Sequence, residues 1–278
     1  MGCDNPTDPT AFAVNSGNNS LRFAIFADTP YNEEQVDSLP RYIEQLNLLN
    51  KSFVIHLGDI KGGTSPCVET YYVKIANFFH ESSSPVFFIP GDNEWNDCDD
   101  PNLAWDFWWS HLHNFEDYWP DTFDVERQTV REENFAWVSK KVLLIGINLV
   151  GGKIINQEEW DLRLAQDAEW VTTQFESNKN SVGAAVVFAH ASPQNDNLDI
   201  FFDTFVLSAQ SFEKPILYIN GNNHIWLVDT PFPKEAPNVT QVQLKGGNRY
   251  NSPPILITVN LTALNVFDIN HQFSFSYF

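Results

Sequence analysis

Short apolar runs that end abruptly in a polar residue recur along the chain from residue 21 onward. The runs are rich in Val, Ile and Phe, which is typical of strands buried on both faces of a sheet. Between several of them, apolar residues recur three or four positions apart, which is typical of helices that cover such a sheet. The alternation predicts a mainly parallel sheet. The strands expected in this part are residues 21–27, 53–57, 86–89, 142–147, 186–189 and 216–219.

Helical patterns occupy three of the intervening segments. The first is 33–50, although Pro40 weakens it. The second has an apolar stripe between residues 68 and 79, and the third has one between residues 160 and 175, with Asn156 as its N-cap. Near the end of the chain, turns rather than helices join the apolar runs, which predicts an antiparallel extension or a second sheet. The strands expected there are residues 239–244, 255–259, 266–269 and 273–278.

Two segments stand outside this pattern. Residues 95–134 are rich in Trp and Asp, have weak periodicity, and are interpreted as a partly helical insertion near the functional site. Residues 1–20 are polar and are expected to be either a flexible tail or a lipoprotein-type tether, because Cys3 after Gly2 resembles the start of a mature bacterial lipoprotein. The remaining residues, 21–278, are expected to form one domain.

Charge and composition limit the partners of the protein. The 278 residues include 16 basic and 36 acidic ones, for a formal net charge of −20. Nucleic acid held in a basic groove needs clustered Lys and Arg, so the charge argues against long nucleic acids as partners. No apolar stretch is long enough for a transmembrane segment. The hydrophobic fraction of 43% suffices for a substantial core, and the aromatic fraction of 14% predicts ring-lined layers.

Residues able to bind a metal follow the ends of the predicted strands. Ligands in open α/β sheets bind beyond the carboxyl ends of the strands. A single polar residue there is usually a turn former, but a series of them is not what turns alone produce. Carboxylate, amide oxygen and imidazole together suit Mn, Fe or Zn. The candidate metal ligands are Asp28, Asp59, Asn93, His190 and His224, with Asn222 near them.

The motifs around these residues resemble the series of calcineurin-like metallophosphoesterases. That series is D-x-H, G-D, G-D/N-N-H/E, H and G-H-x-H, and its counterparts occur here in the same order between residues 21 and 269. They are Phe26-Ala-Asp28, Leu57-Gly-Asp59, Gly91-Asp-Asn-Glu94, His190 and Gly221-Asn-Asn-His224.

The resemblance implies a fold and a place for the protein. It implies an α/β protein, a four-layer α/β/β/α sandwich of two packed mixed β-sheets flanked by helices. Residues 58–67 and 90–98 further resemble an exported bacterial branch with the motifs GDIKGGxSPC and PGDNEWxDC. The protein is therefore expected to be exported, either as a periplasmic or cell-surface lipoprotein with a lipid anchor at Cys3, or as a secreted protein. The oligomeric state is not indicated.

Carried over to this chain, the resemblance implies a site for one or two metal ions. Asp28, Asp59 and His224 match ligands of the first metal. Asp59, Asn93 and His190 match ligands of the second, with Asp59 as the bridge. The metals would be Mn, Fe or Zn, and Mg or Ca is possible.

The chain departs from the family pattern at two places. Pro30 stands where the family has the His of D-x-H, and Asn222 stands where it has the first His of G-H-x-H. Asn222 can still offer an amide oxygen, and Tyr31 can approach the first metal. Glu94 occupies the place of a His that protonates the leaving group in many members, and it can act as an acid only with a raised pKa.

The implied reaction is hydrolysis of phosphate mono- or diesters of small molecules by metal-bound hydroxide. Lys61 follows the Asp59 loop and can meet a phosphate oxygen, and the ring of Trp95 can stack on a base or a sugar. The candidate catalytic residues are Asp59, Asn93, Glu94 and His190, and the candidate substrate-binding residues are Tyr31, Lys61, Trp95 and Asn148.

Two other functions stay open. The two missing histidines are also compatible with a non-catalytic or weakly active binding protein on a degenerate phosphoesterase fold. A nucleotidase or nuclease of the same fold is the other alternative. The acidic charge argues against long polynucleotides as its substrates, but not against single nucleotides.

Two cysteines, Cys67 and Cys98, follow the second and third predicted strands in loops that should share one rim. They match paired positions in the exported branch, and exported proteins are oxidised, so a disulfide between them is expected. Two buried thiols are the alternative.

Overall fold

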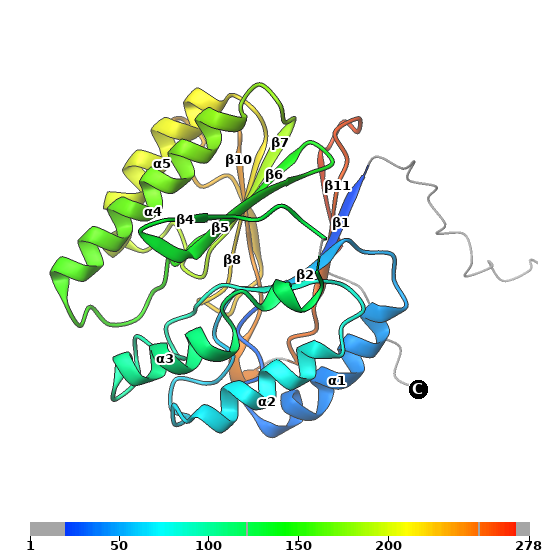
Figure 1. Ribbon diagram of the computed structural model, residues 1–278. Coiled ribbons are helices and arrows are strands. Elements are labelled where there is room, and N and C mark those ends of the chain that lie inside the picture. Colours follow the sequence, from blue (N-terminus) through cyan, green and yellow to red (C-terminus); the bar gives the residue numbers. More distant parts are fainter. Residues whose placement is uncertain (1–19, 121, 250, 271–278) are drawn as a thin grey trace, which may run out of the picture.

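Two β-sheets pack face to face, and helices cover both outer faces (Figure 1). The computed structural model describes residues 20–120, 122–249 and 251–270. Its layers follow the order helix, sheet, sheet, helix, so the expected four-layer sandwich is confirmed. Among the helices of the described residues, none is both long and apolar enough to cross a membrane.

The first sheet has five strands in the order β12-β11-β1-β2-β3. β1 (Leu21–Phe26), β2 (Phe53–His56) and β3 (Val86–Phe88) are parallel. β11 (Ile255–Val259) pairs antiparallel with β1, and β12 (Phe267–Asn270) pairs antiparallel with β11. The three parallel strands therefore end at the same edge of the sheet, where the predicted ligands begin.

The second sheet has seven strands in the order β4-β5-β6-β7-β8-β10-β9. Its centre, β6 to β8 and β10, is parallel, and the remaining strands pair antiparallel at the two edges. The strands are β4 (Glu126–Gln128), β5 (Arg131–Ser139), β6 (Val142–Gly146), β7 (Ala184–Phe188), β8 (Ile216–Asn220), β9 (Leu227–Asp229) and β10 (Val239–Gln243).

Helices α1 to α3 cover the first sheet, and α4 and α5 cover the second (Figure 1). The predicted N-cap of α4 is confirmed, because the Asn156 side chain accepts the N–H groups of Glu158 and Glu159. α1 continues through Pro40. The helices are α1 (Glu33–Asn47), α2 (Glu69–His80), α3 (Pro101–His111), α4 (Gln157–Asn178) and α5 (Asp199–Phe212), with short 3₁₀ helices at Phe115–Tyr118, Asp196–Leu198 and Gly247–Arg249.

Aromatic rings fill the space between the two sheets. Phe23 of β1 stacks on Phe53 of β2 with ring centroids 4.8 Å apart. Phe87 of β3 stacks on Trp137 of β5 at 4.3 Å, which joins the first sheet to the second. All four rings are buried, and each contributes roughly 1.5–3 kcal/mol by leaving water. The predicted ring-lined layer therefore fixes the sheets, and with them the strand ends, relative to each other.

The end of the chain is divided between the two sheets. β11 and β12 are antiparallel as expected, whereas β10 lies in the second sheet between β9, with which it is antiparallel, and β8, with which it is parallel, so antiparallel pairing was wrong for one of its two neighbours. Residues 95–134 contain α3, a 3₁₀ helix, β4 and the start of β5. The expected strand 273–278 and the Cys3 segment lie outside the described residues.

Candidate metal centre

The carboxyl ends of parallel strands from both sheets bring three predicted ligands together. Asp28 follows β1, Asp59 follows β2 and His190 follows β7. Each offers one ligand atom, and these atoms all lie within 4.8 Å of one another. All three side chains are buried. Residues far apart in the sequence thus form one compact cluster.

Four residues of the site have a left-handed backbone. Asp28 has a φ of 52°, Asp59 of 58°, Asn222 of 68° and His224 of 60°. For residues with a side chain this conformation costs roughly 1–2 kcal/mol each. Such backbone strain concentrates at functional sites, where the surrounding structure holds it in place.

Two glycines allow the loops after β2 and β3 to touch. A Cβ on Gly58 would lie 2.2 Å from the backbone nitrogen of Gly91, and a Cβ on Gly91 would lie 2.2 Å from that of Asp59. No other residue fits at either place without moving the backbone. This close approach lets the N–H of Asn93 donate to Asp59 Oδ1 at 3.0 Å.

The imidazole of His190 points into the cluster. Its Nδ1 lies 2.7 Å from the carbonyl oxygen of Leu57, which fixes the ring and directs Nε2 toward two carboxylates. Nε2 lies 3.4 Å from Asp59 Oδ1 and 3.1 Å from Asp92 Oδ1. Burial alone would lower the pKa of His190, but these carboxylates raise it well above its usual value. The pocket therefore favours a positive charge at Nε2, from a proton or a metal ion.

Asp28 and His224 form the other side of the cluster. The N–H of Asn222 donates to both carboxylate oxygens of Asp28, at 2.9 and 3.1 Å. His224 Nε2 lies 3.3 Å from Asp28 Oδ1, and this contact raises the pKa of His224. Burial raises the pKa of Asp28. The contacts hold the carboxylate and the imidazole in the relative position that a shared cation requires.

The hydroxyl of Tyr31 lies between the two sides. It donates to Asp59 and accepts a hydrogen bond of 2.8 Å from the amide of Asn93. It also lies 3.3 Å from His224 Nε2. The predicted approach of Tyr31 to the first ligand group is therefore seen, next to the position where Pro30 replaces the family histidine.

The donor set fits a metal ion. Three carboxylates, those of Asp28, Asp59 and Asp92, are buried close to two imidazoles. Buried carboxylates lose their hydration and repel one another, and this costs free energy unless a cation compensates their charge. Carboxylate oxygen and imidazole nitrogen are ligands of Mn, Fe and Zn.

Asp92 was not among the predicted site residues. It stands inside the Gly91-Asp-Asn-Glu94 motif, so the signal was present in the sequence. It was missed because the direction of its carboxylate depends on a loop after β3 that only the fold reveals. In the structure its Oδ1 is the nearer of the two carboxylate oxygens that face His190.

Two predicted amide ligands are engaged in other contacts. The Nδ2 of Asn93 donates to Asp59 Oδ2 at 2.5 Å, and its amide oxygen faces Gly63, where a Cβ would approach it to 2.7 Å. The side chain of Asn222 lies against Gly151, where a Cβ would come within 2.2 Å of its Nδ2. A half-turn of the Asn93 amide would present its oxygen to the cluster, so its role as a ligand stays a prediction.

Glu94 and Lys61 are buried beside the cluster. The Glu94 carboxylate accepts the N–H of Asp59 at 3.0 Å and that of Gly91 at 2.7 Å, so it joins the two loops. Burial raises the pKa of Glu94 to about 8. A raised pKa is what a carboxyl group needs to act as a general acid. The ammonium of Lys61 donates to the carbonyl of Ser65 at 2.9 Å.

Cys67 and Cys98 form the expected disulfide, with Cα atoms 6.1 Å apart. The bond joins the loop that begins at Asp59 to the loop that carries Asn93. It therefore fixes two ligand-bearing loops to each other. Trp95 and Asn148, in contrast, line a pocket next to the cluster.

The chain is similar to several known proteins. A family model described as calcineurin-like phosphoesterase matches residues 21–226. One similar structure is GAP50, described as the anchor in the inner membrane complex of Plasmodium, with a TM-score of 0.51 and 12% identity over 90% of this chain and 88% of that one. No curated protein sequence matches the chain significantly.

Two further structures share the fold. A 5'-nucleotidase from Candida albicans SC5314 has a TM-score of 0.51 and 16% identity over 90% of this chain and 51% of that chain. A purple acid phosphatase, PPD1, from yellow lupin (Lupinus luteus) seeds has a TM-score of 0.52 and 10% identity over 86% of this chain and 49% of that chain. The protein spans about half the length of these two chains, and at such identities the likeness shows the fold alone.

Proposed function

The chain belongs to the calcineurin-like phosphoesterase family, and from this membership we propose that it is a metal-dependent hydrolase of phosphate esters. The observation that carries the proposal is the convergence of Asp28, Asp59 and His190 within 4.8 Å, in the order and at the strand ends that the family motifs occupy. Buried carboxylates and imidazoles of this kind fit one or two divalent or trivalent ions.

The residues of the site would have the following roles in binding a metal. Asp28 and His224 would hold a metal from the side of β1 and β8, and Asp59 and His190 from the side of β2 and β7. When bound, the metal supplies positive charge for the phosphate oxygens and activates water. Tyr31 holds the Asp59 carboxylate in place through its hydroxyl.

The proposed substrates are small phosphorylated molecules. The net charge of −20 opposes the binding of a long polyanion, so single nucleotides fit the proposal better than polynucleotides. We also propose that the protein is exported, which the disulfide between Cys67 and Cys98 supports, because disulfides persist mainly in oxidising compartments.

The proposal is tested with p-nitrophenyl phosphate and bis(p-nitrophenyl) phosphate as chromogenic mono- and diester substrates. Purified protein is stripped with a chelator and then supplied separately with Mn, Fe, Zn, Mg or Ca. We expect turnover of at least one ester that depends on added metal and disappears with the chelator. Metal binding without turnover of either ester, or of a set of nucleoside monophosphates, would instead favour the binding protein.

Replacing Tyr31 by phenylalanine is expected to weaken Mn²⁺ binding by about 10–100-fold, the usual effect of losing a partner that orients a metal ligand. The hydroxyl donates to Asp59 and accepts from Asn93, so the variant removes one hydrogen-bond partner from each residue. Isothermal titration of the stripped protein measures the affinity. Tyr118→Phe, at a 60% exposed side chain, is the control and should bind like the wild type. Equal affinities for both variants would rule out this role of Tyr31.

A further inference from the structure

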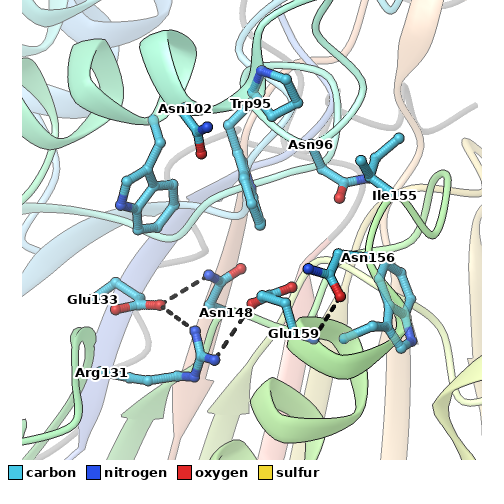
Figure 2. Close-up of a pocket in the computed structure, with 12 residues that line it drawn as sticks. Trp95, Asn96, Asn102, Arg131, Glu133, Asn148, Ile155, Asn156 and Glu159 are labelled. Atoms are coloured by element: carbon cyan, nitrogen blue, oxygen red, sulfur yellow. Dashed lines mark hydrogen bonds and ion pairs between the residues drawn. The ribbon is translucent and has the colours of Figure 1, made fainter.

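A second pocket, with a volume of about 330 Å³, opens between the N-terminal parts of α3 and α4. Its size lies in the usual range for small-molecule sites. We name it the Trp95 pocket; Figure 2 shows Trp95 reaching from above toward Arg131, Glu133, Asn148 and Glu159. None of these residues belongs to the cluster of metal ligands, so the pocket needs an explanation of its own.

Three indoles line the Trp95 pocket: Trp95, Trp105 and Trp160. The guanidinium of Arg163 lies over the rings of Trp95 and Trp160, 5.4 and 4.8 Å from their centroids. Arg163 is fully buried, so it packs against these two rings from inside the protein. The lining therefore offers flat apolar surface, and the attraction of Trp95 and Trp160 for cations is already used by an arginine.

The charges at the pocket are paired with each other. Arg131 lies 3.5 Å from Glu133 and 3.4 Å from Glu159, and Arg163 lies 3.0 Å from Glu159. Counting Arg163, which lies behind the lining, two guanidiniums balance the two carboxylates Glu133 and Glu159 within a strongly acidic chain. A phosphate group and a free cation would each have to compete with these ion pairs.

Asn148 provides a fixed polar group at the floor. Its backbone N–H donates to Asn134 at 2.7 Å, its carbonyl accepts from Arg163 at 3.1 Å, and its Nδ2 donates to Glu133 at 3.0 Å. Its side-chain oxygen is buried and has no hydrogen-bond partner among the described residues. Such an open acceptor is costly in a protein interior, and a bound hydroxyl would satisfy it.

We propose that the Trp95 pocket binds a neutral sugar ring. Indole faces suit the apolar faces of such a ring; amides donate to and accept from hydroxyl groups, and carboxylates accept from them. Further amides line the pocket without adding charge: that of Asn102 is on an exposed residue, while Asn96 already donates to Lys153 and Asn156 already accepts from Glu158. An uncharged ring with apolar faces and several hydroxyls matches these features.

The pocket adjoins the metal centre through the backbone. Leu149, the residue after Asn148, accepts the N–H of His190 with its carbonyl oxygen at 3.1 Å. Trp95 directly follows Glu94, which joins the two ligand loops. The proposal nevertheless rests on the lining of the pocket alone and does not depend on phosphatase activity.

The test follows the indole N–H resonances of the full-length protein labelled with ¹⁵N-tryptophan. The probes are the methyl glycosides of glucose, galactose, mannose and N-acetylglucosamine, with choline and sulfate as charged comparators. Titrations are run with and without Mn²⁺, so that glycoside binding is measured independently of whether the metal site binds an ion. We expect at least one glycoside to bind with a dissociation constant of about 1 mM, and choline and sulfate to cause no shifts of these indoles.

Two variants locate the binding. Ile155→Trp places a bulky ring at the pocket rim from a side chain that is 62% exposed, so it should block the pocket and leave the core intact. Trp105→Leu removes a stacking surface and should weaken binding about tenfold. Leu207→Trp, at a 63% exposed side chain on α5, is the matched control and should bind normally.

The proposal is overturned if no glycoside binds, or if choline or sulfate binds at these indoles instead. It is also overturned if a glycoside binds Ile155→Trp as well as it binds Leu207→Trp. Loss of binding in Ile155→Trp with retention in Leu207→Trp supports it, even if Trp105→Leu does not fold.

Discussion

Replacing Asp59 by asparagine is expected to lower metal-dependent ester hydrolysis by about 1000-fold or more. Its Oδ1 accepts the N–H of Asn93 and faces His190, and its Oδ2 accepts from Tyr31. Burial would raise the pKa of Asp59, but the contact with His190 lowers it, so the group is an anion at neutral pH. Asparagine keeps the shape and loses the charge, and the metal then loses several kcal/mol of its stabilisation of the transition state.

The rate is measured with the better of the two chromogenic esters at saturating metal. Asp203→Asn removes an exposed carboxylate from α5 and serves as the matched control, with unchanged turnover expected. Thermal unfolding shows whether Asp59→Asn remains folded. A folded Asp59→Asn variant with less than a tenfold loss of turnover would exclude Asp59 from the reaction.

Loss of the disulfide should cost about 3–4 kcal/mol of unfolding free energy. Cys67 and Cys98 are 31 positions apart, and the loop they close restricts the unfolded chain. For a chain of this size the loss corresponds to a fall in Tm of roughly 10 °C. Because the bond joins the loops of Asp59 and Asn93, the double variant Cys67→Ser/Cys98→Ser should also bind Mn²⁺ more weakly.

Urea unfolding of the double variant gives the free energy. Cys3→Ser is the control, because it removes a cysteine and leaves the pair intact. Peptide mapping of the unreduced wild type should recover the linked Cys67 and Cys98 peptides. Equal stability of the double variant and the control would show that the bond does not stabilise the fold.

The sequence predicted the buried central strands better than the short strands at the sheet edges. Buried strands such as β1, β2 and β8 are visible in the sequence as apolar runs. Their predicted bounds agree with those in the structure to within one or two residues. The edge strands β4 and β9 have no such signal, because they are short and largely exposed. Their place in the sheet depends on neighbours that the local pattern does not contain.

The parallel pairing of β10 could not be read from its own residues. Val239–Gln243 follows a turn-rich segment, and such segments usually connect antiparallel strands. In the structure β10 does pair antiparallel with β9 across this segment, but its other neighbour is β8, with which it is parallel. Only the tertiary arrangement reveals this second, parallel pairing.

The sequence predicted which residues meet at the site, but not where all of their side chains point. Position at a strand end predicted which residues converge, and Asp28, Asp59 and His190 do so. The direction of a side chain within a loop was not predictable, because it depends on which backbone groups the loop leaves open. Lys61 therefore donates to backbone carbonyls, and Asn148 points into the Trp95 pocket.

The most direct test of the central claim is the metal content of the protein. The protein is stripped with a chelator, incubated with excess Mn²⁺ and freed of unbound ion. Its metal content is then measured by inductively coupled plasma mass spectrometry. We predict one or two ions per wild-type chain, and fewer for His190→Ala. A wild-type chain that retains no Mn, and likewise no Fe or Zn, would contradict the assignment of these residues to a metal centre.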